Sequence, residues 1–276
     1  MMANIPKVSI ILPVYNGERF LARAIRSVQA QSFQDWELVV VDDGSKDGSA
    51  AVARTAAEKD KRLKYVFQEN SGIQKALNHG LSLARGEYVA RVDDDDEWLD
   101  QEKLQAQVDF LNAHPEHVLI GTGAIVKDEA GRELYRYLPP IEDVAIRQRL
   151  LQRNCFIHSS VLFRAEPVRR LGGYPETKET LHVEDYDLWL RLGRNGKLAN
   201  LPRYATGFTL RPGNISSRNK SEQFQKDLRL TSAYRRDYPG YLPAMARGYL
   251  RLWGYRLFRL LPGALRNKIL KTYKEF

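Results

Sequence analysis

The chain has 276 residues, with 43 Lys and Arg against 34 Asp and Glu, which gives a net charge of +9 at neutral pH. This length can bury a large core and fits one globular domain with appendages, and the mixed composition excludes a disordered chain. The positive charge favours an anionic partner such as a nucleotide, a nucleic acid or a lipid head group, without choosing among them.

The chain carries one cysteine, Cys155, so an internal disulfide and a cysteine-rich zinc site are excluded, and we assign this residue a packing role. The first seven residues lack the basic and then apolar order of a signal peptide. No apolar run reaches the roughly 18 residues that span a bilayer. We therefore expect a cytoplasmic protein.

The first part of the chain alternates short apolar runs with segments of helical periodicity. We expect strands at 8–14, 36–41, 63–67 and 88–92, and helices at 19–31, 49–59 and 72–84. This rhythm predicts an α/β fold with a mostly parallel sheet covered by helices on both faces, whose ligands bind beyond the carboxyl ends of the strands.

The pattern loosens from about residue 118, where we expect strands at 119–126, 133–138 and 160–163 and a helix at 141–151. The stretch from Ala244 to Phe276 is different, because it is basic, aromatic and amphipathic. We predict one domain over 1–217, with a donor half of about 1–117 and an acceptor half of about 118–217. A helical amphipathic extension is predicted over 218–276.

Four adjacent acids, Asp93 to Asp96, directly follow the strand expected at 88–92. Neighbouring carboxylates repel one another unless a cation neutralises them. Oxygen ligands of this kind suit Mg²⁺ or Mn²⁺, which usually bridge to a phosphate. A solvated acidic turn before the helix expected from Gln101 is the alternative interpretation.

A further acid, Asp42, stands at the end of the second expected strand, where it could accept from a base N–H or a ribose hydroxyl. For Asp43 and Ser45 we favour capping of the following helix, for which Asp47 is also a candidate. The segment from Pro13 to Phe20 matches neither the Gly-rich dinucleotide fingerprint nor the P-loop, so a nucleotide would be held differently.

Several motifs together resemble, in order and spacing, the inverting family 2 glycosyltransferases of the GT-A fold, over about residues 7 to 217. They are Pro13-Val14-Tyr15-Asn16-Gly17, Val41-Asp42-Asp43-Gly44-Ser45, Asn70 with Gly72, Ala76 and Asn78, Gly86-Glu87-Tyr88, Asp93-Asp94-Asp95-Asp96 and Glu184-Asp185. The resemblance implies a Rossmann-like sheet, a nucleotide-sugar donor and a metal-dependent, hexosyltransferase-type enzyme that inverts the anomeric carbon.

The resemblance also implies a donor site with Mn²⁺ or Mg²⁺ as cofactor. Asp93 and Asp95 take the places of the family's Asp-x-Asp pair, with Asp95 as the direct metal ligand and Asp93 nearer the ribose. Asp96 is expected to cap the next segment. The residues expected at the donor, besides this pair, are Asp42 at the base, the backbone of Pro13, Val14 and Tyr15, then Lys75, Asp94 and Arg211.

The pair Glu184 and Asp185 begins an expected helix, where acids are common because they favour the helix dipole. The resemblance assigns Asp185 as the general base that takes the proton of the acceptor hydroxyl, with Glu184 as the less favoured candidate. For His158 we favour a structural role over a place in the acceptor pocket, and for His182 a solvated loop position.

One departure from the family concerns the segment Phe208 to Ser216, which resembles a closing loop where a histidine often contacts the metal. Arg211 takes that place here. Arginine cannot ligate a cation, although it can pair with a diphosphate. The third metal ligand is therefore open.

We predict an inverting glycosyltransferase of bacterial surface polysaccharide or glycolipid assembly, with a UDP-sugar donor and a glycan or lipid-linked acceptor. Trp253 and Phe258 of the basic tail would insert into the inner face of the cell membrane. Packing of this tail on its own domain or on a second subunit fits equally well. The alternatives are a sugar-nucleotide-binding pseudoenzyme and a nucleic-acid-binding protein, although we expect no nucleic acid among the partners.

Overall fold

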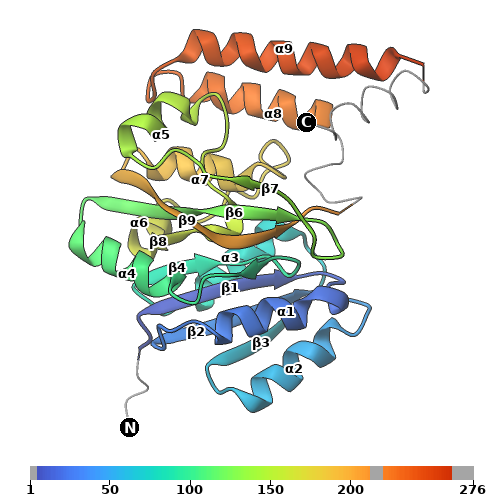
Figure 1. Ribbon diagram of the computed structural model, residues 1–276, viewed down its shortest axis with the longest axis vertical. Helices are drawn as coiled ribbons and strands as arrows, with labels where there is room; N and C mark the ends of the chain where they lie inside the picture. The colour runs from blue at the N-terminus through green and yellow to red at the C-terminus, as the bar shows by residue number, and fades with distance from the viewer. Residues whose placement is uncertain (1–4, 212–219, 263–276) are drawn as a thin grey trace.

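The computed structural model describes residues 5–211 and 220–262 (Figure 1). Within these residues nine strands form one sheet in the spatial order β3-β2-β1-β4-β8-β6-β9-β5, and β7 pairs with β6. The strands are β1 (Val8–Val14), β2 (Trp36–Asp43), β3 (Leu63–Gln68), β4 (Tyr88–Arg91), β5 (Glu97–Trp98), β6 (His117–Lys127), β7 (Glu133–Tyr137), β8 (Leu162–Arg164) and β9 (Lys197–Thr209).

The first four strands run parallel, as the alternation of strands and helices predicts. β1 is apolar along most of its length because both of its faces are covered. Ile10 packs into one layer of helices and Ile11 into the other. Val14 lies opposite Asp42 of β2, and Ile11 lies opposite Arg91 of β4. The carboxyl ends of β1, β2 and β4 therefore meet at one edge of the sheet.

The second half extends the same sheet. β8 pairs antiparallel with β4 and β6, whereas β6 and β9 are parallel. The expected strand at 160–163 is β8, which follows a 3-10 turn over His158–Ser160. The sequence interpretation missed β9, the longest strand, and the two-residue β5 that pairs with it.

Helices cover both faces of the sheet. One hydrophobic cluster holds β1 against α1 (Glu18–Gln29), α2 (Ser49–Lys59) and α4 (Lys103–Ala113). On the other face the cluster includes α3 (Ile73–Leu83), α5 (Asp143–Leu150), α6 (Ala165–Arg170) and α7 (Glu184–Leu192). The buried Cys155 is part of this second cluster, which agrees with a packing role.

Two further helices, α8 (Lys220–Ala233) and α9 (Tyr241–Leu260), stack in order on α7, and α9 is outermost (Figure 1). The hydroxyl of Tyr234 donates to the Asp187 carboxylate at 2.8 Å, and that of Tyr238 donates to the Leu190 carbonyl at 2.6 Å. A Cβ at Gly248 would lie 2.5 Å from the Leu228 side chain, so α9 and α8 approach closely there. This pair is packed on its own domain.

The opposite side of α9 carries exposed apolar side chains at helical spacing, with Leu250 75% and Leu257 62% exposed; the others are Leu242, Tyr249, Trp253 and Leu260. Phe258 is only half-buried. The basic residues expected from Arg266 to Lys274 lie outside the described residues. No helix in residues 5–211 or 220–262 combines the length and apolar character needed to cross a membrane.

Candidate functional site

The four acids follow β4 at the edge where β1 and β2 also end. Carboxylate oxygens of Asp93, Asp95 and Asp96 all lie within 4.8 Å of one another. A Cβ built on Gly17 would overlap the carboxylate of Asp94, so this acid packs against the bare Cα that follows β1. The strand ends thus gather the acids into one group, as the run of aspartates predicts.

Several hydrogen bonds fix this group within the protein. Both oxygens of Asp93 pair with the guanidinium of Arg91, which is buried and therefore does not reach out to a phosphate or ribose. Asp96 accepts from the Ser159 hydroxyl at 2.5 Å and from the backbone N–H of Thr209 at 2.9 Å. The expectation that Asp96 caps the next segment is therefore wrong, because this carboxylate ties β9 to the 3-10 turn.

The pKa shifts record the crowding of negative charge. Burial, together with the charges of Asp95 and Asp93, raises the pKa of Asp94 to about 8. Burial and the charge of Asp93 raise the pKa of Asp95 to about 6, against the lowering effect of Arg211. The buried Asp96 also has a raised pKa, with desolvation as the main cause. Proteins tolerate such shifts most often at functional sites.

Arg211, at the end of the described part of β9 and its loop, forms an ion pair with Asp95 at 2.8 Å. The guanidinium of Arg23 on α1 donates to the backbone carbonyl of Asp95 at 2.9 Å. Arg211 therefore reaches the acid assigned to the metal, at the position where the family often has a histidine. The rest of that segment, Pro212 to Ser216, lies outside the described residues.

The end of β2 holds two buried acids with different partners. Asp42 accepts from the Tyr65 hydroxyl at 2.8 Å and from the backbone N–H of Ser45 at 2.8 Å. Asp43 accepts from the backbone N–H groups of Ser71 and Gly72, both at 2.9 Å. Asp43 thus orders the loop before α3, and not the start of α2 that we expected.

The remaining capping residues lie between α1 and α2. The Ser45 hydroxyl accepts the backbone N–H of Asn16 at 3.0 Å, so it does not cap α2. Asp47 accepts from the backbone N–H groups of Ser49 and Glu18, both at 3.0 Å. The carboxylate of Asp47 therefore bonds to the first turns of both helices, from the position just before Gly48, which is the N-cap of α2.

The other residues expected at the donor flank this edge. Pro13 and Val14 are buried in β1, while Tyr15 follows the strand and is half exposed. Lys75 is exposed in the first turn of α3 and makes no hydrogen bond or ion pair with the described residues. The structure therefore places Tyr15 just beyond the carboxyl end of β1, and Lys75 on an exposed surface of α3.

Asp185 is in the first turn of α7 and is partly buried. The Asn154 side-chain amide donates to its carboxylate at 2.9 Å. Burial raises the pKa of Asp185, Arg91 lowers it and the charge of Asp93 raises it further. Asp185 is therefore close enough to Arg91 and Asp93 to be affected by their charges, and the segment from Asn154 to Ser159 contacts both Asp185 and the acids after β4.

Glu184 has a different partner. Its carboxylate accepts the backbone N–H of His182 at 2.6 Å, and burial and the charge of Asp185 raise its pKa to about 7. His158 is enclosed by Tyr174 and Trp189, and its ring nitrogen lies 2.9 Å from the Tyr174 hydroxyl. Burial lowers the pKa of His158 well below its usual value, which agrees with a structural role.

The residues of the acidic group fit a divalent cation. Three carboxylates lie close enough to share one ion, and the raised pKa values of Asp95 and Asp96, caused by burial and by neighbouring acids, show that their negative charge is not fully compensated. Carboxylate oxygens are the ligands that Mg²⁺ and Mn²⁺ prefer. All three acids are bonded to protein donors, Asp93 to Arg91, Asp96 to Ser159 and Thr209, and Asp95 to Arg211, so a cation at Asp95 would share this carboxylate with Arg211 or displace it.

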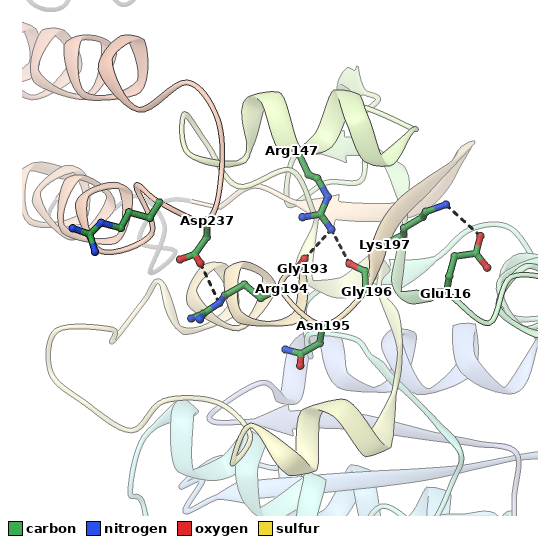
Figure 2. Close-up of a pocket in the computed structure, with 9 residues that line it drawn as sticks. Glu116, Arg147, Gly193, Arg194, Asn195, Gly196, Lys197 and Asp237 are labelled. Carbon is green, nitrogen blue, oxygen red and sulfur yellow. Dashed lines mark hydrogen bonds and ion pairs between the residues drawn. The ribbon is translucent and has the colours of Figure 1, made fainter.

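A hollow of about 730 Å³ lies away from the acids after β4 (Figure 2). It is next to Lys197 at the start of β9, the opposite end of that strand from the acids. Figure 2 shows Arg147 on the carbonyls of Gly193 and Gly196, and Lys197 near Glu116. Because most of its charged side chains are already paired, among them Arg147, Arg194 and Lys197, we assign no ligand to this hollow.

Sequence reasoning missed residues whose role depends on long-range contacts. Asn154 orients the proposed base, and Ser159 and Thr209 hold the acidic group. No motif marks them: Asn154 lies in the loop after α5, Ser159 in the 3-10 turn and Thr209 at the end of β9. The role of Thr209 could not be predicted for a further reason: the strand that carries it, β9, was not predicted.

The sequence of the chain is similar to those of known glycosyltransferases. The profile of the family described as Glycosyl transferase family 2 matches residues 9–172. The chain is 36% identical over 198 residues to the amylovoran biosynthesis glycosyltransferase AmsE of Erwinia amylovora, covering 70% of this chain and 73% of that protein.

Two solved structures show the same fold. TarS of S. aureus, residues 1–349, in complex with UDP-GlcNAc has a TM-score of 0.69 at 20% identity, over 90% of this chain and 73% of that one. The mannosyltransferase PcManGT of Pyrobaculum calidifontis, in complex with GDP-Man and Mn²⁺, has a TM-score of 0.66 at 21% identity, over 98% and 81%. The fold expected from the sequence is thereby confirmed.

Proposed function

Because the chain belongs to glycosyl transferase family 2, we propose that this glycosyltransferase moves a hexose from a UDP-sugar to an acceptor hydroxyl with inversion at the anomeric carbon. The observation that carries the proposal is the segment from Asn154 to Ser159, which bonds to Asp185 through the Asn154 amide and to Asp93 and Asp96 through the Ser159 hydroxyl. This shared contact supports one site in which the acids after β4 bind the diphosphate and Asp185 is the base.

The donor half of the proposal rests on the acids after β4. Asp95, with Asp93, would hold Mn²⁺ or Mg²⁺. When bound, such an ion would offset the charge of the departing nucleoside diphosphate. Arg211 can pair with the same diphosphate, since its guanidinium already reaches Asp95 and is suited to phosphate oxygens. Asp42 and the backbone of Pro13 to Tyr15 are proposed to line the nucleoside pocket.

The acceptor half rests on Asp185. Its carboxylate would accept the proton of the acceptor hydroxyl as that oxygen attacks the anomeric carbon from the face opposite the diphosphate. A carboxylate is basic enough because the hydroxyl becomes acidic only as the new bond forms. The Asn154 amide keeps one oxygen of Asp185 oriented during this step. Glu184 is bonded to the backbone of His182, which favours Asp185 as the base.

The setting that we propose is polysaccharide or glycolipid assembly at the inner face of the cell membrane. AmsE, a relative of similar length, is named for the biosynthesis of a polysaccharide. The outer side of α9 presents leucines and Trp253 to solvent, and the helix carries four arginines and no acidic residue. Such a surface suits the interface of an anionic membrane.

A panel of nucleotide sugars tests the proposal. We expect UDP-sugars to raise the melting temperature in the presence of Mn²⁺ and not with EDTA, and GDP- and TDP-sugars to raise it less. A labelled donor that stabilises the protein should then be consumed when cell-envelope glycolipid is added. Binding without any transfer would support a pseudoenzyme, and no Mn²⁺-dependent stabilisation by any nucleotide sugar would overturn the proposal.

A further inference from the structure

A cavity of about 420 Å³ adjoins the proposed base and is bordered by the C-terminal helices. Asp185 and Asn154 line one side of it. Lys220 and Phe224 of α8 and Arg251 of α9 line the other. The helices that follow the family-matched region therefore form part of the wall beside the reacting hydroxyl.

The cations of this cavity have no ion-pair partner among the described residues. Arg153, Lys220 and Arg251 come from three different segments and line the same space. Arg251 lies over the Phe224 ring at 4.6 Å, and Arg153 lies 5.7 Å from the Tyr137 ring centre. Aromatic contacts thus hold two guanidiniums at the cavity while leaving their N–H groups for an anion.

The acids of the cavity do not cancel these cations. Asp185 is bonded to Asn154 and is reserved for the acceptor hydroxyl in our proposal. Burial raises the pKa of Asp227 to about 6, and the charge of Arg251 opposes that rise. The cavity is therefore lined by three cations, Arg153, Lys220 and Arg251, and by two carboxylates, Asp185 and Asp227. Burial disfavours the charged form of Asp227. The excess of positive charge favours an anionic ligand.

We infer that this cavity binds a phosphate or diphosphate group of the acceptor, next to the sugar whose hydroxyl Asp185 deprotonates. The inference rests on the proposed function, since it needs Asp185 to act on an acceptor. The phosphate would come from an isoprenoid diphosphate carrier, because Arg251 lies on α9 between the exposed Leu250 and Trp253. A lipid chain leaving the cavity would meet that apolar surface.

Binding of farnesyl diphosphate to the full chain tests the inference. The protein is first saturated with UDP and Mn²⁺, so that the donor site is filled, and affinity is measured by calorimetry. We expect Arg153→Gln and Arg251→Gln each to weaken binding roughly tenfold or more, because each removes a charge-assisted hydrogen bond. Arg251→Lys should retain much of the affinity.

Arg259→Gln is the matched control, since it removes the same charge from α9 outside the cavity, and it should bind as the wild type does. Inorganic pyrophosphate separates the sources of the phosphate. Weaker binding of pyrophosphate than of farnesyl diphosphate supports a lipid carrier, while equal binding supports the phosphate site with a water-soluble sugar phosphate as the acceptor.

Unchanged affinity in both Arg153→Gln and Arg251→Gln would overturn the inference. So would a wild-type protein that binds UDP and Mn²⁺ but not farnesyl diphosphate. A wild-type protein that binds no UDP with Mn²⁺ would instead contradict the proposed function. Because UDP binding is measured in every variant, a variant that fails to fold is recognised by losing that binding as well.

Discussion

The edge of the sheet after β4 and the outer side of α9 both collect charge of one sign, but they do so in opposite ways. At the edge, acids such as Asp95 and Asp96 are enclosed and bonded to the protein, and burial together with the charge of Asp93 raises their pKa values. On α9, arginines alternate with exposed leucines and have no acidic neighbour on the helix.

This difference in enclosure suits the acids after β4 to a small ion and the outer side of α9 to a large partner. Charge enclosed at a sheet edge costs folding free energy, which a bound cation and diphosphate would return. Charge on an exposed helix costs little, because water screens it. Substitution of acids at the edge should therefore change both catalysis and stability. Substitution of exposed leucines on the outer side of α9 should change only the association with a membrane.

The largest effect is expected from Asp185→Asn, which removes the proposed base and keeps its shape. We expect kcat to fall by about 10³-fold, within the range for loss of general base catalysis. The affinity for UDP with Mn²⁺ should stay within about twofold, since the donor acids are untouched. Single-turnover transfer and calorimetry separate the two quantities. Glu184→Gln is the control and should lose far less; an equal loss in both variants would contradict the assignment.

The next effect is expected from Asp95→Asn. Loss of a metal ligand should weaken Mn²⁺-dependent binding of UDP roughly 100-fold. At neutral pH the apo protein should become more stable, on the order of 1 kcal/mol, because the pKa of Asp95 is raised to about 6 by burial and repulsion. Urea unfolding with EDTA measures this gain. Glu102→Gln, an exposed acid nearby, should change neither quantity, and a destabilised Asp95→Asn protein would argue against stored repulsion.

Much of this edge could be predicted, because its strands are nearly continuous apolar runs and its acids are consecutive in the chain. The expected strand at 8–14 is β1, and the helix at 49–59 is α2. These elements are determined by local patterns. The approach of Asp42, Asp95 and the end of β1 then follows from parallel pairing alone.

The rest of the site depends on contacts that no local pattern encodes. β9 was missed because Pro202 and Arg203 interrupt its apolar residues, and its register with β6 shifts between Thr122 and Gly123. Thr209, on that strand, reaches Asp96 from 113 residues away. The role of α8 and α9 as a wall of the cavity beside Asp185 arises in the same way, from tertiary packing.

The outer side of α9 is tested by Leu250→Asn combined with Leu257→Asn. Both side chains are mostly exposed, so the melting temperature should not change. Partitioning onto phosphatidylglycerol vesicles should fall about tenfold, since two apolar side chains no longer enter the interface. Vesicle sedimentation measures it. Leu134→Asn, an exposed leucine on β7, is the control; equal binding by both proteins would show that α9 is not the membrane surface.

The smallest effect concerns the apo protein between pH 7 and pH 8. Burial and the charges of Asp95 and Asp93 raise the pKa of Asp94 to about 8, whereas the unfolded chain loses this proton near pH 4. The native state therefore binds more protons than the unfolded state, and stability falls as pH rises from about 4 to about 8.

Buried His158, whose pKa is lowered, has the opposite slope, but only below about pH 6.5, so the window from pH 7 to 8 isolates the acids. With EDTA present, we expect wild-type unfolding free energy to fall by up to about 1 kcal/mol across that window. In Asp94→Asn the fall should be smaller, because the amide carries no proton to lose. Urea titrations at both pH values measure the slopes. Parallel slopes would mean that Asp94 is ionised throughout and that the edge is less crowded than the structure indicates.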